Sequence, residues 1–120
     1  MVAVSRVNSC RGCAFVHERW ASRAGVTSED LRAIGLGDLE DLDDRNRAAV
    51  AYAAALAEAR FRRPIAAELA TAVCDHYTPD EVAAVEAVAR AMAFANLSAN
   101  TAEDLLVRMR SPRVSEAGTR

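Results

Sequence analysis

The stretch of sequence that decides the fold reads Asn8-Ser9-Cys10-Arg11-Gly12-Cys13-Ala14-Phe15-Val16-His17-Glu18. It holds two of the three cysteines and one of the two histidines of the chain. No proline occurs between this stretch and Gly25, so we predict one helix over residues 10–24. Asn8 or Ser9 would supply the N-cap oxygen, and Gly25 would end the helix in the left-handed conformation.

The sulfur and imidazole groups share one face of this predicted helix. Cys10 and Cys13 are spaced i and i+3, and His17 follows Cys13 at i+4, so the three side chains point to the same side. Cys10 would lie in the first turn, where unpaired backbone N–H groups and the helix dipole favour a thiolate. The spacing therefore predicts a reactive dithiol with an imidazole beside it.

The composition is that of one small, nearly neutral domain. The chain has 120 residues, enough for a single domain to bury its own core. Apolar residues make up 52% and aromatic residues only 5%, with alanine supplying much of the apolar share, which favours closely packed helices. Lys and Arg number 15 against 17 Asp and Glu, so the chain has no general basic field for nucleic acid.

The sequence patterning predicts a cytoplasmic protein without a membrane span. No apolar run approaches the roughly 20 residues that a transmembrane helix needs. The N-terminus lacks the charged-then-apolar pattern of a signal peptide. Three cysteines, two of them in a C-x-x-C pair, do not make the disulfide framework of a small secreted protein.

The rest of the chain predicts an all-α fold, a single-domain bundle of about six helices. The clearest helix start is at Thr78, which caps, followed by Pro79 at the first helical position and Glu81 completing a capping box. Beyond residues 10–24, we expect helices over residues 27–34, 45–60, 65–76, 79 to about 96, and 101–109. The domain is expected to cover residues 1–110, with a disordered tail over residues 111–120.

Two features point beyond an isolated, complete domain. Residues 1–7 are short and apolar, predict either a strand or the tail of a helix, and begin without a capping residue. This indicates a truncated or mis-assigned start. The two long helices are rich in alanine and valine, so each buries little area, and we expect another subunit to cover part of the apolar surface.

A second cysteine and histidine, in Cys74-Asp75-His76, raise the question of a zinc site with Cys10 and Cys13. A C-x-H pair on a helix splays its side chains apart, so we predict no metal site and no cofactor. Cys74 is expected to be a buried small hydrophobe.

The stretch from Val7 to His17, followed by the Gly25 turn and a Ser28-Glu29-Asp30-Leu31 helix start, resembles the alkylhydroperoxidase D-like branch of the carboxymuconolactone decarboxylase superfamily. The later layout is similar too, with Asp44-Arg45 at a helix start, the capped helix at residues 78–81 and Asn96 near the end of that helix. The resemblance covers residues 4–106, nearly the whole chain.

The resemblance implies a fold, an activity and residue roles. Family members are all-helical, commonly trimers or hexamers, and the active ones reduce organic hydroperoxides in antioxidant defence. Cys13 would be the peroxidatic nucleophile, and Cys10 would resolve its sulfenic acid as an intramolecular disulfide. His17 would belong to the proton relay that activates the thiols. A dithiol reductant, a lipoyl-bearing or thioredoxin-like protein, would then reduce the disulfide.

Two departures from the family pattern concern the relay. Active members carry a glutamate well before the first cysteine, at a position this sequence lacks because only nine residues precede Cys10. Some members have a histidine where this chain has Gly12. Three explanations stay open: a longer upstream segment, substitution by Glu18 or by a carboxylate of another subunit, or an impaired relay.

Other readings of the same residues also stay open. The cysteines are alternatively two core thiols, since free cysteine is among the most buried residue types. His17 is alternatively a packed residue, and Trp20 is core or interface filler or a wall of the pocket. The competing function is a non-catalytic or redox-sensing helical oligomer. A carboxymuconolactone decarboxylase-type reaction is disfavoured, because that branch generally does not rely on a C-x-x-C pair.

Overall fold

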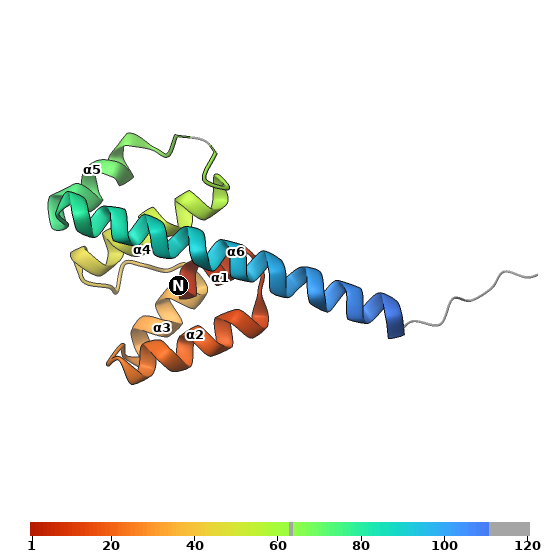
Figure 1. The fold of residues 1–120 in the computed structure, drawn as a ribbon. Coiled ribbons are helices and arrows are strands. Elements are labelled where there is room, and N and C mark those ends of the chain that lie inside the picture. The colour runs from red at the N-terminus through yellow and green to blue at the C-terminus, as the bar shows by residue number, and fades with distance from the viewer. Residues whose placement is uncertain (63, 111–120) are drawn as a thin grey trace, which may run out of the picture.

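The structure is a computed structural model that describes residues 1–62 and 64–110. Within these residues the chain forms six helices (Figure 1). Their bounds are α1 Val2–Val7, α2 Arg11–Arg23, α3 Ser28–Leu36, α4 Asp44–Glu58, α5 Ala67–His76 and α6 Pro79–Arg110. No strand occurs within these residues, so the predicted all-α single domain is confirmed. Residues 1–7 form a helix, and the tail predicted for residues 111–120 lies outside the described residues.

The long helix α6 crosses the whole molecule, and the other helices pack around its first two thirds (Figure 1). α1 and α4 contact it directly, α5 joins α4, and the α2–α3 pair is attached through α1. The core between α1, α4 and α6 consists of Val4, Ala53, Ala57, Ala89 and Ala93. Because four of these residues are alanines, the helix axes can approach closely, and the short helix α1 fits between α2, α4 and α6.

Side-chain caps fix where three of the six helices, α3, α4 and α6, begin. Thr27 and Asp43 each accept a hydrogen bond from the backbone N–H three residues on, at 3.1 and 3.0 Å. Thr78 and Glu81 form the predicted reciprocal box, with the Thr78 N–H donating to Glu81 Oε2 at 2.8 Å and the Glu81 N–H donating to Thr78 Oγ1 at 3.3 Å. Gly37, with a φ of 76°, caps α3 at its C-terminal end, and the helix ends at Leu36, two residues later than predicted.

The prediction that Asn8 or Ser9 caps α2 is wrong. Cys10 is the N-cap residue, and no side chain accepts a hydrogen bond there. The reason is that Asn8 and Ser9 finish α1, donating their backbone N–H groups to Val4 and Arg6 carbonyls. Ser9 then turns the chain with a φ of 54°, which brings α2 back alongside α1. Gly25, with a φ of 94°, follows the end of α2 as predicted.

The predicted break between residues 96 and 101 is also wrong, because α6 runs unbroken to Arg110. No proline or glycine lies in this segment. The Ser98 and Thr101 hydroxyls donate to carbonyls one turn back within the helix, so these polar side chains do not compete with the helical hydrogen bonds. The inward stripe passes through Ala89, Ala93 and Asn96, which leaves Leu97 60% exposed.

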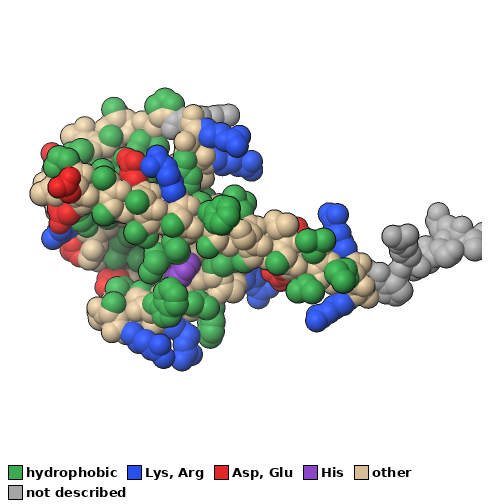
Figure 2. Space-filling model, viewed as in Figure 1, with side chains coloured by type: hydrophobic (Ala, Val, Ile, Leu, Met, Phe, Trp, Pro, Cys, Tyr) green, Lys and Arg blue, Asp and Glu red, His purple; other side chains and the backbone are tan. Residues whose placement is uncertain are grey.

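By length and composition alone, α6 is long and apolar enough to cross a membrane, a criterion that core helices of soluble proteins also meet. It has 32 residues, and an 18-residue window reaches a mean hydropathy of 1.3, with 17% of that window buried. Alanine and valine supply this hydropathy, and the same residues pack α6 onto α1 and α4. Figure 2 shows further apolar side chains exposed along α6, where it leaves the body of the molecule.

Candidate dithiol site

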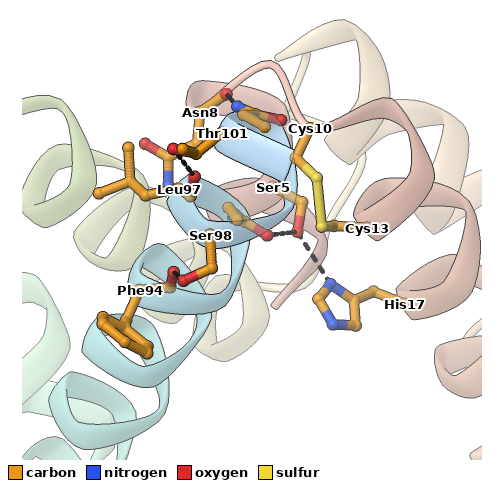
Figure 3. Close-up of a disulfide and its surroundings, with 11 residues drawn as sticks. Ser5, Asn8, Cys10, Cys13, His17, Phe94, Leu97, Ser98 and Thr101 are labelled. Atoms are coloured by element: carbon orange, nitrogen blue, oxygen red, sulfur yellow. Dashed lines mark hydrogen bonds between the residues drawn. A yellow bond between two sulfur atoms is a disulfide. The ribbon is translucent and has the colours of Figure 1, made fainter. Parts of the chain in front are cut away.

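Cys10 and Cys13 form a disulfide at the start of α2, with their Cα atoms 5.3 Å apart (Figure 3). Cys10 is the N-cap residue and Cys13 lies in the first helical turn. The Cys10 N–H donates to the Ser5 carbonyl at 2.9 Å, which ties this end of α2 to α1. The chain therefore holds the two sulfurs within bonding reach through the local geometry of one helix start.

The two sulfurs differ in access. Cys10 is 4% exposed, while Cys13 is only partly buried. An incoming molecule can therefore reach Cys13 more readily than Cys10. The N-cap position instead favours a thiolate at Cys10, because this thiolate would accept hydrogen bonds from the unpaired N–H groups of the first turn. Its greater exposure favours Cys13 as the sulfur that attacks an incoming molecule. The N-cap position favours the thiolate form of Cys10, which would then attack Cys13 to form the disulfide.

A buried hydrogen-bonded chain runs from His17 through Ser5 to Asn96. Figure 3 shows its first link, between His17 and Ser5. His17 Nδ1 and Ser5 Oγ lie 2.8 Å apart, and Ser5 Oγ donates to Asn96 Oδ1 at 3.2 Å. Ser5 and Asn96 have no exposed surface, and His17 is 7% exposed. Three helices, α1, α2 and α6, thus meet at one polar contact inside an otherwise apolar core.

The hydrogen-bond directions set the tautomer of His17. Ser5 has one hydroxyl hydrogen, which it gives to Asn96, so it must accept from His17. His17 Nδ1 then carries the ring proton, and Nε2 keeps a free lone pair. No described residue hydrogen-bonds to Nε2.

Burial lowers the pKa of His17, and the nearby positive amino group of Met1 lowers this pKa further. Both effects favour the neutral imidazole near pH 7. A neutral imidazole with a free nitrogen can accept a proton, which is the property a general base requires.

The predicted site residues Cys10, Cys13 and His17 are thus brought together on α2. Glu18, considered as a substitute for the relay carboxylate, instead forms an ion pair with Arg6 at 2.5 Å on the surface. Trp20 is 53% exposed, so within this chain it is not core filler. Its ring centroid lies 5.7 Å from that of His17, at a tilt of 54°.

The second grouping of cysteine and histidine forms no site. Cys74 is a free, exposed thiol, so the prediction that it is buried is wrong. The helix α5 buries only Val73 on its inner face, and Cys74 is rotated about 100° away from that residue. His76 is exposed too, and residues 1–62 and 64–110 contain no group of three metal ligands.

Neither Ser5 nor a buried hydrogen-bonding role for Asn96 was predicted from the sequence. Ser5 is a polar residue in the apolar run 1–7, and Asn96 continues the spacing of Ala89 and Ala93 on the inner face of α6. A polar residue in the register of an apolar stripe was the available signal. That the two residues meet across 91 positions could not be inferred from one sequence.

Comparisons with protein-family models, curated proteins and solved structures find no match. No family membership is shown by them. The resemblance to the alkylhydroperoxidase D-like branch rests on the motif residues and the order of the helices, and it remains a prediction.

Proposed function

We propose that this chain is a thiol-dependent peroxidase that reduces organic hydroperoxides through the Cys10–Cys13 dithiol. One observation carries the proposal: a vicinal cysteine pair lies at a helix start, in disulfide geometry, one turn from a buried, hydrogen-bonded histidine. A reactive pair, a nearby base and a partner thiol within reach are the requirements of such chemistry.

The cycle begins with the reduced dithiol. The Cys13 thiolate attacks the terminal oxygen of the hydroperoxide, an S–O bond forms, the O–O bond breaks, and the alkoxide takes a proton to leave as an alcohol. The Cys10 thiol then attacks the sulfenic acid, an S–S bond forms and water leaves. A dithiol reductant, of the lipoyl-bearing or thioredoxin-like class, returns two electrons and two protons and is itself oxidised to a disulfide.

His17 serves the proton transfers in this scheme. Its lowered pKa keeps it neutral, so it can take a thiol proton on Nε2, the ring nitrogen that carries no proton. Ser5 and Asn96 act as positioning residues, because they orient the imidazole without contacting the reacting atoms in this scheme. No carboxylate of the described residues hydrogen-bonds to His17, and Glu18 pairs with Arg6, so the described residues supply no relay carboxylate.

The functional unit is proposed to be a cytoplasmic homo-oligomer, a trimer or hexamer. Support comes from the apolar side chains that α6 leaves exposed beyond its contacts with the body. Phe94 is 75% exposed, Leu97 60% and Met109 80%. Exposed apolar residues repeated along one helix are typical of a surface that associates with another copy or another protein.

Trapping the sulfenic acid tests the proposal. In Cys10→Ser, a single equivalent of an organic hydroperoxide should leave a sulfenic acid on Cys13, which dimedone labels and peptide mapping locates. In Cys13→Ser, the same treatment should give no dimedone adduct at Cys10. Labelling of Cys10 in that variant, with none on Cys13 in the first, would assign the attacking role to Cys10 instead. Failure of both variants and of the wild type to react faster than free cysteine would leave the pair a structural or redox-sensing disulfide.

A further inference from the structure

An apolar pocket of about 410 Å³ lies between α1, α2, α3, α4 and α6. Its volume falls in the range of about 300–1,000 Å³ that small-molecule sites occupy in proteins. His17 forms part of its wall, but Cys10, Cys13 and Ser5 do not. The pocket is therefore distinct from the disulfide. His17 contributes both to the wall of the pocket and to the candidate dithiol site.

The wall of the pocket is almost wholly hydrocarbon. It consists of alanine, valine, leucine, isoleucine and methionine side chains, among them Leu31, Ile34, Val50, Val85 and Val88. His17 supplies the one polar side chain of the lining. An apolar cavity with a single polar side chain selects a ligand that matches this pattern, because burying an unpaired polar group costs free energy.

His17 presents a defined hydrogen-bonding group. Ser5 occupies Nδ1 and Asn96 fixes the direction of the Ser5 hydroxyl, so the ring proton stays on Nδ1. Nε2, which no described residue contacts by a hydrogen bond, is then an acceptor. An acceptor in an apolar wall is complementary to a ligand with a donor, not to a second acceptor.

We propose that this pocket binds an uncharged, apolar small molecule that carries one hydrogen-bond donor, such as an aliphatic alcohol, with the donor placed on His17 Nε2. The surroundings disfavour charge, because burial lowers the pKa of both His17 and the Met1 amino group. The same desolvation opposes a carboxylate in the pocket. This inference does not depend on the proposed thiol chemistry.

The test measures binding of 1-hexanol, its methyl ether and hexanoate to the whole protein by NMR. 1-Hexanol should shift the methyl signals of Val50 and Val85 and move the Nε2 nitrogen signal of His17. The methyl ether, which cannot donate, should bind about threefold to tenfold more weakly, the value of one hydrogen bond. Hexanoate should bind more weakly still. The imidazole nitrogen shifts also report directly whether Nδ1 carries the proton.

Two matched variants locate the site. Ala84→Phe places a ring in the pocket from the exposed side of α6, and it should weaken 1-hexanol binding at least about tenfold. Ala83→Phe adds the same ring at the neighbouring exposed residue, outside the lining, and should leave binding unchanged. The experiment is repeated in Cys10→Ser/Cys13→Ser, where binding should persist, so a failed peroxidase reaction and a failed binding site are distinguished.

The proposal is overturned if hexanoate binds more tightly than 1-hexanol, or if the ether binds as well as the alcohol. It is also wrong if no probe shifts the pocket signals. In that case the oligomeric mass of Ala84→Phe is measured by light scattering, and a changed mass is the informative result. That last result would identify the pocket as an interface between copies of the chain.

Discussion

The chain contains two groupings of cysteine and histidine, and among the described residues only one of them is held by buried partners from other helices. Cys10, Cys13 and His17 lie at the start of α2, where α1 and α6 supply Ser5 and Asn96 as buried partners. Cys74 and His76 lie on the outer side of α5, both exposed. The residue types are the same, so the difference lies in what packs against them. A buried polar contact between three helices holds the first grouping, which makes it the candidate site, whereas the second grouping lies on the surface.

The largest expected effect separates the two groupings by activity. Cys13→Ser should lower the rate of organic hydroperoxide reduction at least about a hundredfold, because the attacking thiol is gone. Cys74→Ser should leave the rate unchanged. The measurement is hydroperoxide consumption in the presence of a small dithiol such as dihydrolipoamide. An equal loss in both variants would remove the distinction between the groupings.

A smaller effect is expected from the supporting residues. Ser5→Ala removes the partner of His17 Nδ1, and the imidazole then loses its fixed tautomer, so the rate should fall about tenfold. The pH–rate profile should change as well, which a merely destabilised protein would not show. A rate and pH profile identical to those of the wild type would mean that the chain from Ser5 to Asn96 serves packing alone. The matched control is Ser98→Ala, which removes an exposed hydroxyl from α6.

The smallest effect concerns the pH dependence of stability. His17 has a pKa below its ordinary value of 6.5 in the folded chain, so the unfolded chain takes up the proton first as the pH falls. The free energy of unfolding should therefore be highest above about pH 6.5 and should decrease as the pH falls from there through the pKa of folded His17. His17→Gln should flatten this decrease, whereas His76→Gln should retain it. Denaturant unfolding between pH 7.5 and 5 measures both, and a steeper loss in His17→Gln would contradict the assignment.

Much of the fold could be predicted from the sequence because its helix signals are local. The Thr78–Glu81 box and the glycines after α2 and α3 mark helix ends through hydrogen bonds and φ angles within a few residues. The cap of α2 was mistaken because Asn8 and Ser9 complete α1 instead. The continuity of α6 was missed because polar residues at positions 98–101 suggested an end that no glycine or proline enforces.

The candidate site could be predicted only in its local part. The spacing predicts Cys10, Cys13 and His17 on one helix face. The structure has Cys13 and His17 on α2 and Cys10 just before it, as the N-cap residue. The hydrogen-bonding residues that orient the His17 ring come from α1 and from the middle of α6, and the α6 residue lies far from His17 in the sequence. The burial of Cys74 was predicted wrongly because cysteine as a residue type is commonly buried, while the orientation of α5 depends on Val73.

The central claim is that Cys10 and Cys13 form a peroxide-reactive pair, and one titration tests it most directly. The fully reduced protein is mixed with one equivalent of an organic hydroperoxide and followed by intact mass and peptide mapping. We predict a rapid loss of two hydrogens, mapped to a Cys10–Cys13 bridge, with Cys74 still reduced. Thiols that stay reduced, or that react no faster than free cysteine, would contradict the claim.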